Sequence, residues 1–99
     1  MTFNLQWTER GLCEFKAALA FIAEENPGNA QLVMDRTQRT ISHLEFFSLG
    51  TPAMNGSFKI YVPKTSYFVI FRPSKAGDIT ISAFGHASRD WEKIDWENL

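Results

Sequence analysis

The fold of this chain is decided at residues 21–30, which read Phe21-Ile22-Ala23-Glu24-Glu25-Asn26-Pro27-Gly28-Asn29-Ala30. Pro27 cannot continue a helix, because it lacks a backbone donor and its ring clashes with the preceding turn, but it suits the first position of a new helix. Apolar residues at three- and four-residue spacing flank it and predict two amphipathic helices. They are Leu12, Phe15, Leu19 and Ile22 before the break, then Ala30, Val33, Thr37, Ile41, Leu44 and Phe47 or Ser48 after it.

The two helices are expected to form a hairpin. The first is predicted over residues 9–25, with Thr8 as its N-cap. The second follows the proline directly and keeps the same apolar face until Gly50, a natural place for the chain to leave through a left-handed turn. A short strand is predicted before the hairpin at residues 3–7, where apolar and polar side chains alternate.

Three further strands are predicted after Gly50, because residues 58–62, 67–72 and 79–84 are rich in β-branched and aromatic side chains. Their connections are short and carry turn formers, so neighbouring strands should pair antiparallel. The middle strand is apolar on both faces, which places it in the sheet centre. The helical hairpin would cover one face of this strand. A second apolar contact would cover the other face, and a partner is one candidate for it. The expected fold class is α+β, in the order β-α-α-β-β-β, with the hairpin packed on a small, mainly antiparallel sheet.

The composition fits one small domain whose charge is locally uneven. The 99 residues are 44% hydrophobic, enough for a single compact core, so residues 1–99 are expected to form one domain. The formal net charge is −1, so tight direct binding to nucleic acid is not expected. Residues 50–89 carry five basic side chains against one acidic, whereas residues 90–99 carry four acidic against one basic. The chain therefore has a basic middle and an acidic tail from about residue 90.

The sequence predicts a soluble, cytoplasmic protein without membrane contact. Residues 1–5 lack the basic segment and long apolar run of a signal peptide, and no apolar run approaches the ~18 to 20 residues that span a bilayer. Cys13 is the only cysteine and cannot form an internal disulfide. It stands one residue from the apolar stripe of the first helix, so a structural role is expected for it.

Neither a metal nor a cofactor is expected. The two histidines, His43 and His86, stand far apart in the sequence and show no paired ligand spacing with each other or with Cys13. The six glycines form neither a GxGxxG nor a Walker pattern. The sequence therefore does not favour a nucleotide-driven or metal-dependent enzyme.

Residues 84–91 place an imidazole and a guanidinium just beyond the last strand, where side chains from strand ends converge. Together with basic residues of the neighbouring strands they suit phosphate recognition, or acid–base cleavage of RNA with cations on the scissile phosphate. The candidate catalytic group for a ribonuclease is Lys59, Arg72, His86 and Arg89.

The same residues also have a structural interpretation. Arg89 would pair with Asp90 or Glu92 or close the sheet edge, and His86 would satisfy a backbone carbonyl. Trp91 begins an acidic, aromatic tail that caps the core or engages a partner.

Three motifs stand in an order that indicates a family. Residues 21–30 match a helix-hairpin signature that commonly reads Tyr-Ile-Ala, two residues, Asn-Pro, two residues, Ala. Residues 62–72 match a central β-hairpin, and residues 79–81 followed by His86-Ala87-Ser88-Arg89-Asp90-Trp91 match a closing strand with a His-x-x-Arg-x-aromatic ending. In this order the motifs resemble the RelE/ParE superfamily of toxins from type II toxin–antitoxin systems. The resemblance covers about residues 5–92, and that family uses the same element order.

The resemblance implies a bacterial toxin of a plasmid-stabilisation type, neutralised by a cognate antitoxin whose partly disordered tail folds onto it. One branch of the superfamily cleaves messenger RNA on the ribosome, and the ParE branch poisons DNA gyrase. The His-x-x-Arg-Asp-Trp ending and the near-neutral charge favour the ParE branch, hence a gyrase inhibitor that acts by binding rather than as an enzyme. The chain departs from the ParE pattern at Gly50-Thr51, where Gly-Arg is usual, and at Ser57-Phe58-Lys59, where Thr-Arg-Glu is frequent.

Two alternatives remain open at this point: a RelE-like, ribosome-dependent mRNA endoribonuclease, and a toxin-fold protein without activity. Some positions of this chain match motif positions of the family, and the resemblance implies that they contact the target or the antitoxin. They are Arg72, His86, Arg89 and Trp91. A gyrase inhibitor has no catalytic residues, whereas the ribonuclease alternative assigns them to the group of four named above.

Overall fold

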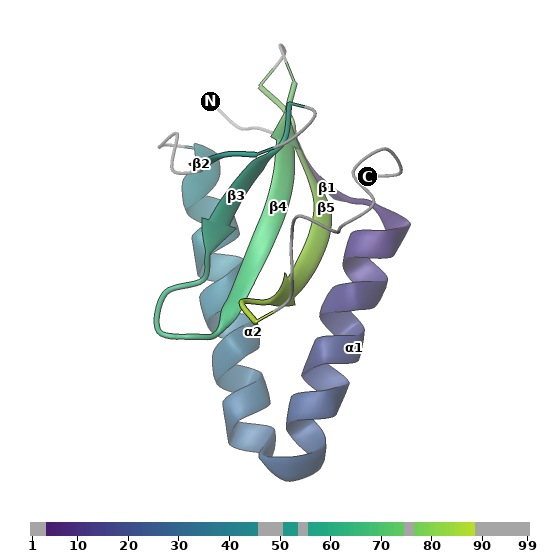
Figure 1. Cartoon of the computed structure of the whole chain (residues 1–99), viewed down its shortest axis with the longest axis vertical. Coiled ribbons are helices and arrows are strands. Elements are labelled where there is room, and N and C mark those ends of the chain that lie inside the picture. Colours follow the sequence, from purple (N-terminus) through teal and green to yellow (C-terminus); the bar gives the residue numbers. More distant parts are fainter. Residues whose placement is uncertain (1–3, 46–50, 54–55, 75–76, 89–99) are drawn as a thin grey trace.

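A helical hairpin lies against one face of a β-sheet in the computed structural model, which describes residues 4–45, 51–53, 56–74 and 77–88 (Figure 1). Within this part of the chain the sheet has five strands. The elements are β1 Leu5–Trp7, α1 Glu9–Glu25, α2 Pro27–Ser42, a 3-10 turn His43–Glu45, β2 Thr51–Pro52, β3 Phe58–Tyr61, β4 Tyr67–Pro73 and β5 Ile79–His86. The predicted α+β class and hairpin-on-sheet arrangement are confirmed.

The break between the helices is made by Asn26 and Pro27, as predicted. Asn26 closes α1 by donating its backbone N–H to Ile22 O at 2.9 Å. Its side-chain Oδ1 then accepts from Asn29 N–H at 3.0 Å, which caps α2, and Pro27 occupies the first turn of that helix. One residue therefore terminates the first helix and starts the second.

The sheet has the order β1-β5-β4-β3-β2. β1 pairs parallel with β5, and the other neighbours pair antiparallel, as expected for a mainly antiparallel sheet. β2, which the sequence pattern did not predict, adds two residues at the edge beside β3. The ladder between β4 and β5 contains a bulge: Ile70 faces Ala83 and Phe71 faces Ile81, so Ser82 is an extra residue in β5.

The main core lies between the hairpin and the sheet, and most of the predicted apolar stripe is buried there. The buried members are Phe15, Ile22, Ala30, Val33, Ile41 and Leu44 from the helical region, with Val62, Val69, Phe71, Ile79, Ile81 and Phe84 from the sheet region.

Three helical expectations need correction. Leu12 is 37% exposed, and Gly11 is buried in its place because α1 begins in contact with β5. Cys13, expected to be structural, is exposed. α2 ends at Ser42 rather than near Gly50, and a 3-10 turn continues the pattern far enough to bury Leu44. Phe47, Ser48 and Gly50 lie outside the described residues.

The opposite sheet face carries a second apolar cluster. Phe68, Ile70 and Ala83 are each at most 1% exposed there, and Ala53 packs against them. The second apolar contact that the apolar middle strand requires is thus made within this chain, and no partner is needed to cover these three side chains.

The start of α1 is held directly against the backbone of β5. Thr8 donates its backbone N–H to Ile81 O at 2.9 Å and its hydroxyl to Ser82 O at 3.2 Å, while its Oγ1 accepts from Gly11 N–H at 3.0 Å. A Cβ on Gly11 would lie 2.9 Å from Ile81 O and 3.1 Å from Ser82 C. Glycine is therefore required at position 11 because the helix and strand backbones approach too closely for a side chain.

We expect Gly11→Ala to lower the free energy of unfolding by about 1–3 kcal/mol, because relieving the overlap must move α1 away from β5. This loss would occur although alanine favours a helix interior by about 1 kcal/mol. Gly28→Ala is the matched control, since its Cβ would meet only Asn26 Oδ1 at 3.5 Å, and it should be neutral or slightly stabilising. Urea denaturation measures both; equal stability of the two variants would contradict the proposed contact.

Candidate functional site

Lys59 and Arg72 lie together on the sheet face that is opposite the helices. The Lys59 ammonium is 5.9 Å from the ring centroid of Phe68 and donates to Tyr61 Oη at 3.1 Å. Arg72 follows Phe68 and Ile70 on the same side of β4, and its Nη2 donates to Ser57 Oγ at 3.4 Å. Because Lys59 is paired with Ile70, the two cations are diagonal neighbours on adjacent strands.

His86 lies on the other face, toward the helices. It is paired with Tyr67, and the two rings meet edge to face with centroids 5.2 Å apart. Tyr67 in turn stacks on the core ring of Phe84 at 5.2 Å. The bulge at Ser82 causes this placement, because it reverses the alternation of β5 and turns Phe84 and His86 to the side that Ile79 and Ile81 occupy.

The His86 ring is oriented by Ser88. Its Nδ1 accepts the Ser88 backbone N–H at 3.0 Å and lies 2.7 Å from Ser88 Oγ. A backbone N–H can only donate, so Nδ1 is an acceptor and the neutral ring carries its proton on Nε2. The alternative prediction that His86 satisfies a backbone carbonyl is therefore wrong for Nδ1, whose backbone partner is a donor.

The structure thus brings together only two of the sequence-predicted site residues, Lys59 and Arg72, and separates His86 from them by the thickness of the sheet. Arg89 and Trp91 lie outside the described residues, so their predicted contacts stay predictions. Sequence position alone predicts that these side chains converge where the strands end. In the structure, side chains alternate between the two faces of each strand, and the bulge in β5 reverses that alternation, so His86 lies on the other face of the sheet.

His86 borders a hollow of about 320 Å³ between the hairpin and the β3–β4 turn. Its lining residues are Ile22, Asn29, Val33, Lys64, Thr65, Ser66, Tyr67 and His86. Because the lining combines an imidazole, an ammonium, an amide and hydroxyls, this hollow suits a polar or anionic ligand.

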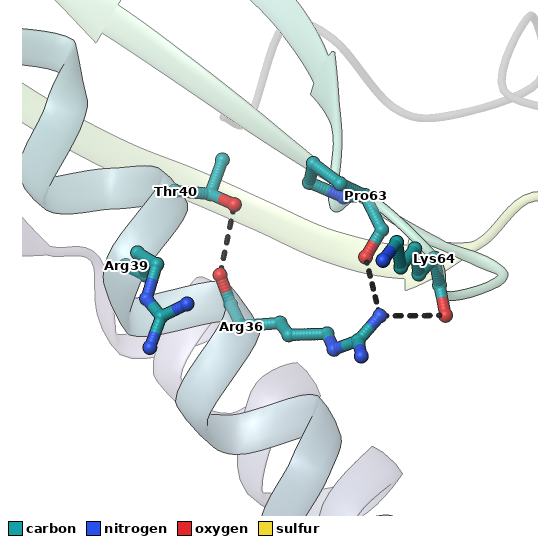
Figure 2. Close-up of a pocket in the computed structure, with 5 residues that line it drawn as sticks. All are labelled: Arg36, Arg39, Thr40, Pro63 and Lys64. Carbon is teal, nitrogen blue, oxygen red and sulfur yellow. Dashed lines mark hydrogen bonds between the residues drawn. The ribbon is translucent and has the colours of Figure 1, made fainter.

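A second hollow beside it, which we name the α2 pocket, is lined by Arg36, Arg39, Thr40, Pro63 and Lys64 and has a volume of about 210 Å³. Figure 2 shows Arg36 extending from α2 to the turn, where its Nη1 donates to Pro63 O and Lys64 O at 3.4 Å each. Sequence reasoning missed this pocket. The only signal was two arginines three residues apart on the second helix, and their meeting with Lys64 depends on the packing of the hairpin.

Lys64 holds an unusual backbone conformation in the turn that forms one wall of the α2 pocket. Its φ is +61°, the only positive value among the described non-glycine residues. The turn is closed by Thr65, which donates both its backbone N–H and its hydroxyl to Val62 O, at 3.2 and 2.8 Å. A left-handed residue after Pro63 is typical of a type II turn, where glycine is usual.

An apolar groove, which we name the β1 groove, lies where β1 meets the two helices. It has a volume of about 270 Å³ and is lined by Leu5, Trp7, Leu12, Phe15, Gln38, Ile41 and Ser42. Trp7 stacks on Phe15 with ring centroids 5.0 Å apart, and Leu5 and Leu12 are 39% and 37% exposed. The groove thus offers apolar surface that this chain leaves partly uncovered.

Within the described ranges, no three His, Cys, Asp or Glu side chains are grouped so as to hold a metal ion. None of the described helices has both the length and the apolar character that crossing a membrane requires.

A comparison of sequences identifies one family, and a comparison of structures finds the same fold in solved proteins. A sequence model of the ParE toxin of the parDE type II toxin–antitoxin system matches residues 5–91. A chain of the chromosomal ParDE toxin–antitoxin system from P. aeruginosa has a similar structure, with a TM-score of 0.73 at 17% identity over 85% of this chain and 95% of that one. No curated protein sequence matches.

More distant structural relatives share the fold. The isolated E. coli RelE toxin gives a TM-score of 0.58 at 15% identity, over 92% of this chain and 90% of that chain. A chain of the intact E. coli RelBE toxin–antitoxin complex gives 0.55 at 13% identity, over 89% and 100%.

The turn at Lys64 generates a test. We expect Lys64→Gly to be more stable than Lys64→Ala by about 1 kcal/mol, because both remove the ammonium but only glycine adopts a positive φ without a Cβ penalty. Thermal and urea unfolding of the two variants measure the difference. Equal stability would show that the left-handed conformation is not maintained in solution.

Proposed function

The chain belongs to the ParE toxin family of type II toxin–antitoxin systems, and we propose that it inhibits DNA gyrase and is neutralised by a cognate antitoxin, in a system that stabilises plasmids. The family match covers residues 5–91, which includes all of the described secondary structure, and so supports the assignment to the ParE branch. Gyrase as the target would place the protein in the cytoplasm.

The observation that carries this proposal is the separation of Lys59 and Arg72 from His86 by the sheet. Acid–base cleavage of RNA needs a proton-transfer group and phosphate-stabilising cations within reach of the same atoms. Among the described members of the candidate group, the cations lie on one face and the imidazole lies on the other, beside Tyr67. This arrangement favours inhibition by binding over cleavage. Arg72, His86, Arg89 and Trp91 are retained as proposed contacts with target or antitoxin.

The test of the target is a supercoiling assay with the purified toxin, relaxed plasmid, ATP and gyrase. We expect loss of supercoiling and accumulation of linear DNA at near-stoichiometric toxin. His86→Ala should keep this inhibition within about fivefold, the effect of one exposed polar contact.

The competing outcome is equally specific. If gyrase is unaffected at excess toxin while the protein still arrests growth, the gyrase proposal fails. Ribosome-dependent mRNA cleavage that His86→Ala abolishes would then establish the RelE-like alternative. Absence of growth arrest by the antitoxin-free protein would indicate a toxin fold without activity.

For neutralisation, we propose that the antitoxin inserts an apolar side chain into the β1 groove. The partly exposed Leu5 and Leu12, with Trp7 and Phe15 beneath them, present the type of recess that an amphipathic segment folding onto a partner uses. The gain would come from removing this apolar surface from water.

We expect Leu12→Glu to weaken antitoxin binding by about tenfold or more, because docking would bury an unpaired carboxylate. Phe21→Glu is the control: Phe21 is on the same helix, is 69% exposed and does not line the β1 groove. Calorimetric titration of each variant with the purified cognate antitoxin measures both affinities. Equal antitoxin affinity of the two variants would show that the antitoxin binds outside the β1 groove.

A further inference from the structure

We propose that the α2 pocket binds phosphate groups of a nucleic-acid backbone, weakly and without sequence preference. The inference goes beyond gyrase inhibition and does not depend on it, because gyrase and the ribosome both carry nucleic acid. It rests on the convergence of three cations that the family assignment does not use: Arg36 and Arg39 from α2, and Lys64 from the β3–β4 turn.

The three cations lack acidic partners in the part of the chain that the structure describes. The salt bridge found there joins Arg10 to Glu14, on α1. Asp35, which precedes Arg36, accepts a hydrogen bond from Gln31 Nε2 at 2.9 Å along the outside of α2. None of the described residues that line the α2 pocket carries a carboxylate, so none of them compensates its positive charge.

Arg36 is positioned before any ligand arrives. Its Nη1 donates to the carbonyls of Pro63 and Lys64, which leaves the remaining nitrogens of the guanidinium fork for an anion. Arg39 lies one helical turn further along α2, on the same pocket (Figure 2). The planar guanidinium fork of Arg36 can bind two phosphate oxygens, and Arg39 and Lys64 add positive charge to the lining of the same pocket.

A second hollow adjoins the α2 pocket. Lys64 also lines the adjacent hollow, which contains Asn29 and His86. Two neighbouring hollows that share Lys64 could bind two successive phosphates of one nucleic-acid strand. A single free anion would use only one of them.

The composition of the α2 pocket favours phosphate over an acidic peptide. Arginine clusters bind phosphate groups and acidic peptide motifs, and many peptides are held in addition by an open strand edge or by recesses for apolar side chains. Here the carbonyls of Pro63 and Lys64 are already occupied by Arg36, and the remaining described lining residues are Arg39 and Thr40. The described lining residues include no aromatic ring for base stacking, so we expect contact with the phosphate backbone that carries no sequence information.

The net charge of −1 leads us to expect weak binding of nucleic acid at the α2 pocket. The chain as a whole does not attract a polyanion, so binding depends on the local cluster and falls steeply with salt. This agrees with the expectation that tight direct nucleic-acid binding is absent.

The test is an NMR titration of the ¹⁵N-labelled full chain, without gyrase or ribosomes, at matched ionic strength. The probes are a 12-base-pair DNA duplex, inorganic phosphate and an octaglutamate peptide. We expect the duplex to shift the amide signals of residues 36–40, 64 and 65. We also expect the duplex to saturate the site at a lower concentration of phosphate groups than inorganic phosphate requires.

Arg39→Gln and Lys64→Gln should each weaken duplex binding by about three- to fivefold and reduce the salt-dependence slope by about one. Arg10→Gln is the control, because it removes the same charge from α1, where Arg10 Nε lies 3.9 Å from Glu14 Oε1. This variant should change neither the affinity for the duplex nor the salt dependence of binding. Arg36 is left intact, since it links α2 to the turn.

Three results would overturn the proposal. The first is the absence of shifts at the amides of residues 36–40, 64 and 65. The second is saturation by inorganic phosphate at the same phosphate concentration, which would make free phosphate the ligand. The third is shifts caused by octaglutamate alone, which would identify a site for an acidic protein segment. None of these depends on whether gyrase is inhibited, so the two proposals fail separately.

Discussion

The contact between the first turn of α1 and the backbone of β5 is the constraint on which the rest of the structure depends. Thr8 bonds to Ile81 and Ser82, and Gly11 allows the two backbones to touch. Glu14 continues the contact by accepting Phe84 N–H at 3.3 Å, at a level where β1 has already ended. β5 is thereby held by β1, β4 and α1 at once, and the hairpin that follows α1 is placed over the sheet.

The bulge in β5 has the largest consequence for function. Ser82 is inserted opposite the Ile70–Phe71 step, so the side chains after it face the reverse of the simple alternation. Without it, His86 would share a face with Arg72. With it, His86 meets Tyr67 and the hairpin, which separates the imidazole from Lys59 and Arg72, while Lys64 lines the same hollow as His86.

The described surfaces divide by chemistry. The β1 groove is apolar and lies at the start of α1, whereas the α2 pocket is cationic and lies beside the β3–β4 turn. Under the proposed function, the toxin is held by its antitoxin and acts on gyrase. Separate apolar and cationic surfaces would let apolar burial drive antitoxin binding, while charge contributes on the target side.

The sequence by itself determined the hairpin, the strands at residues 58–62, 67–72 and 79–84, and the family, because helix breaks at Pro27 and periodic apolar patterns are local signals. It could not reveal that Gly11 rather than Leu12 is buried, or that residues 68, 70 and 83 are covered within the chain. It also could not place His86 or assemble the α2 pocket. These outcomes were decided only in the tertiary structure, because the face of a side chain depends on a bulge in the ladder and the meeting of Arg36 with Lys64 depends on how the hairpin docks.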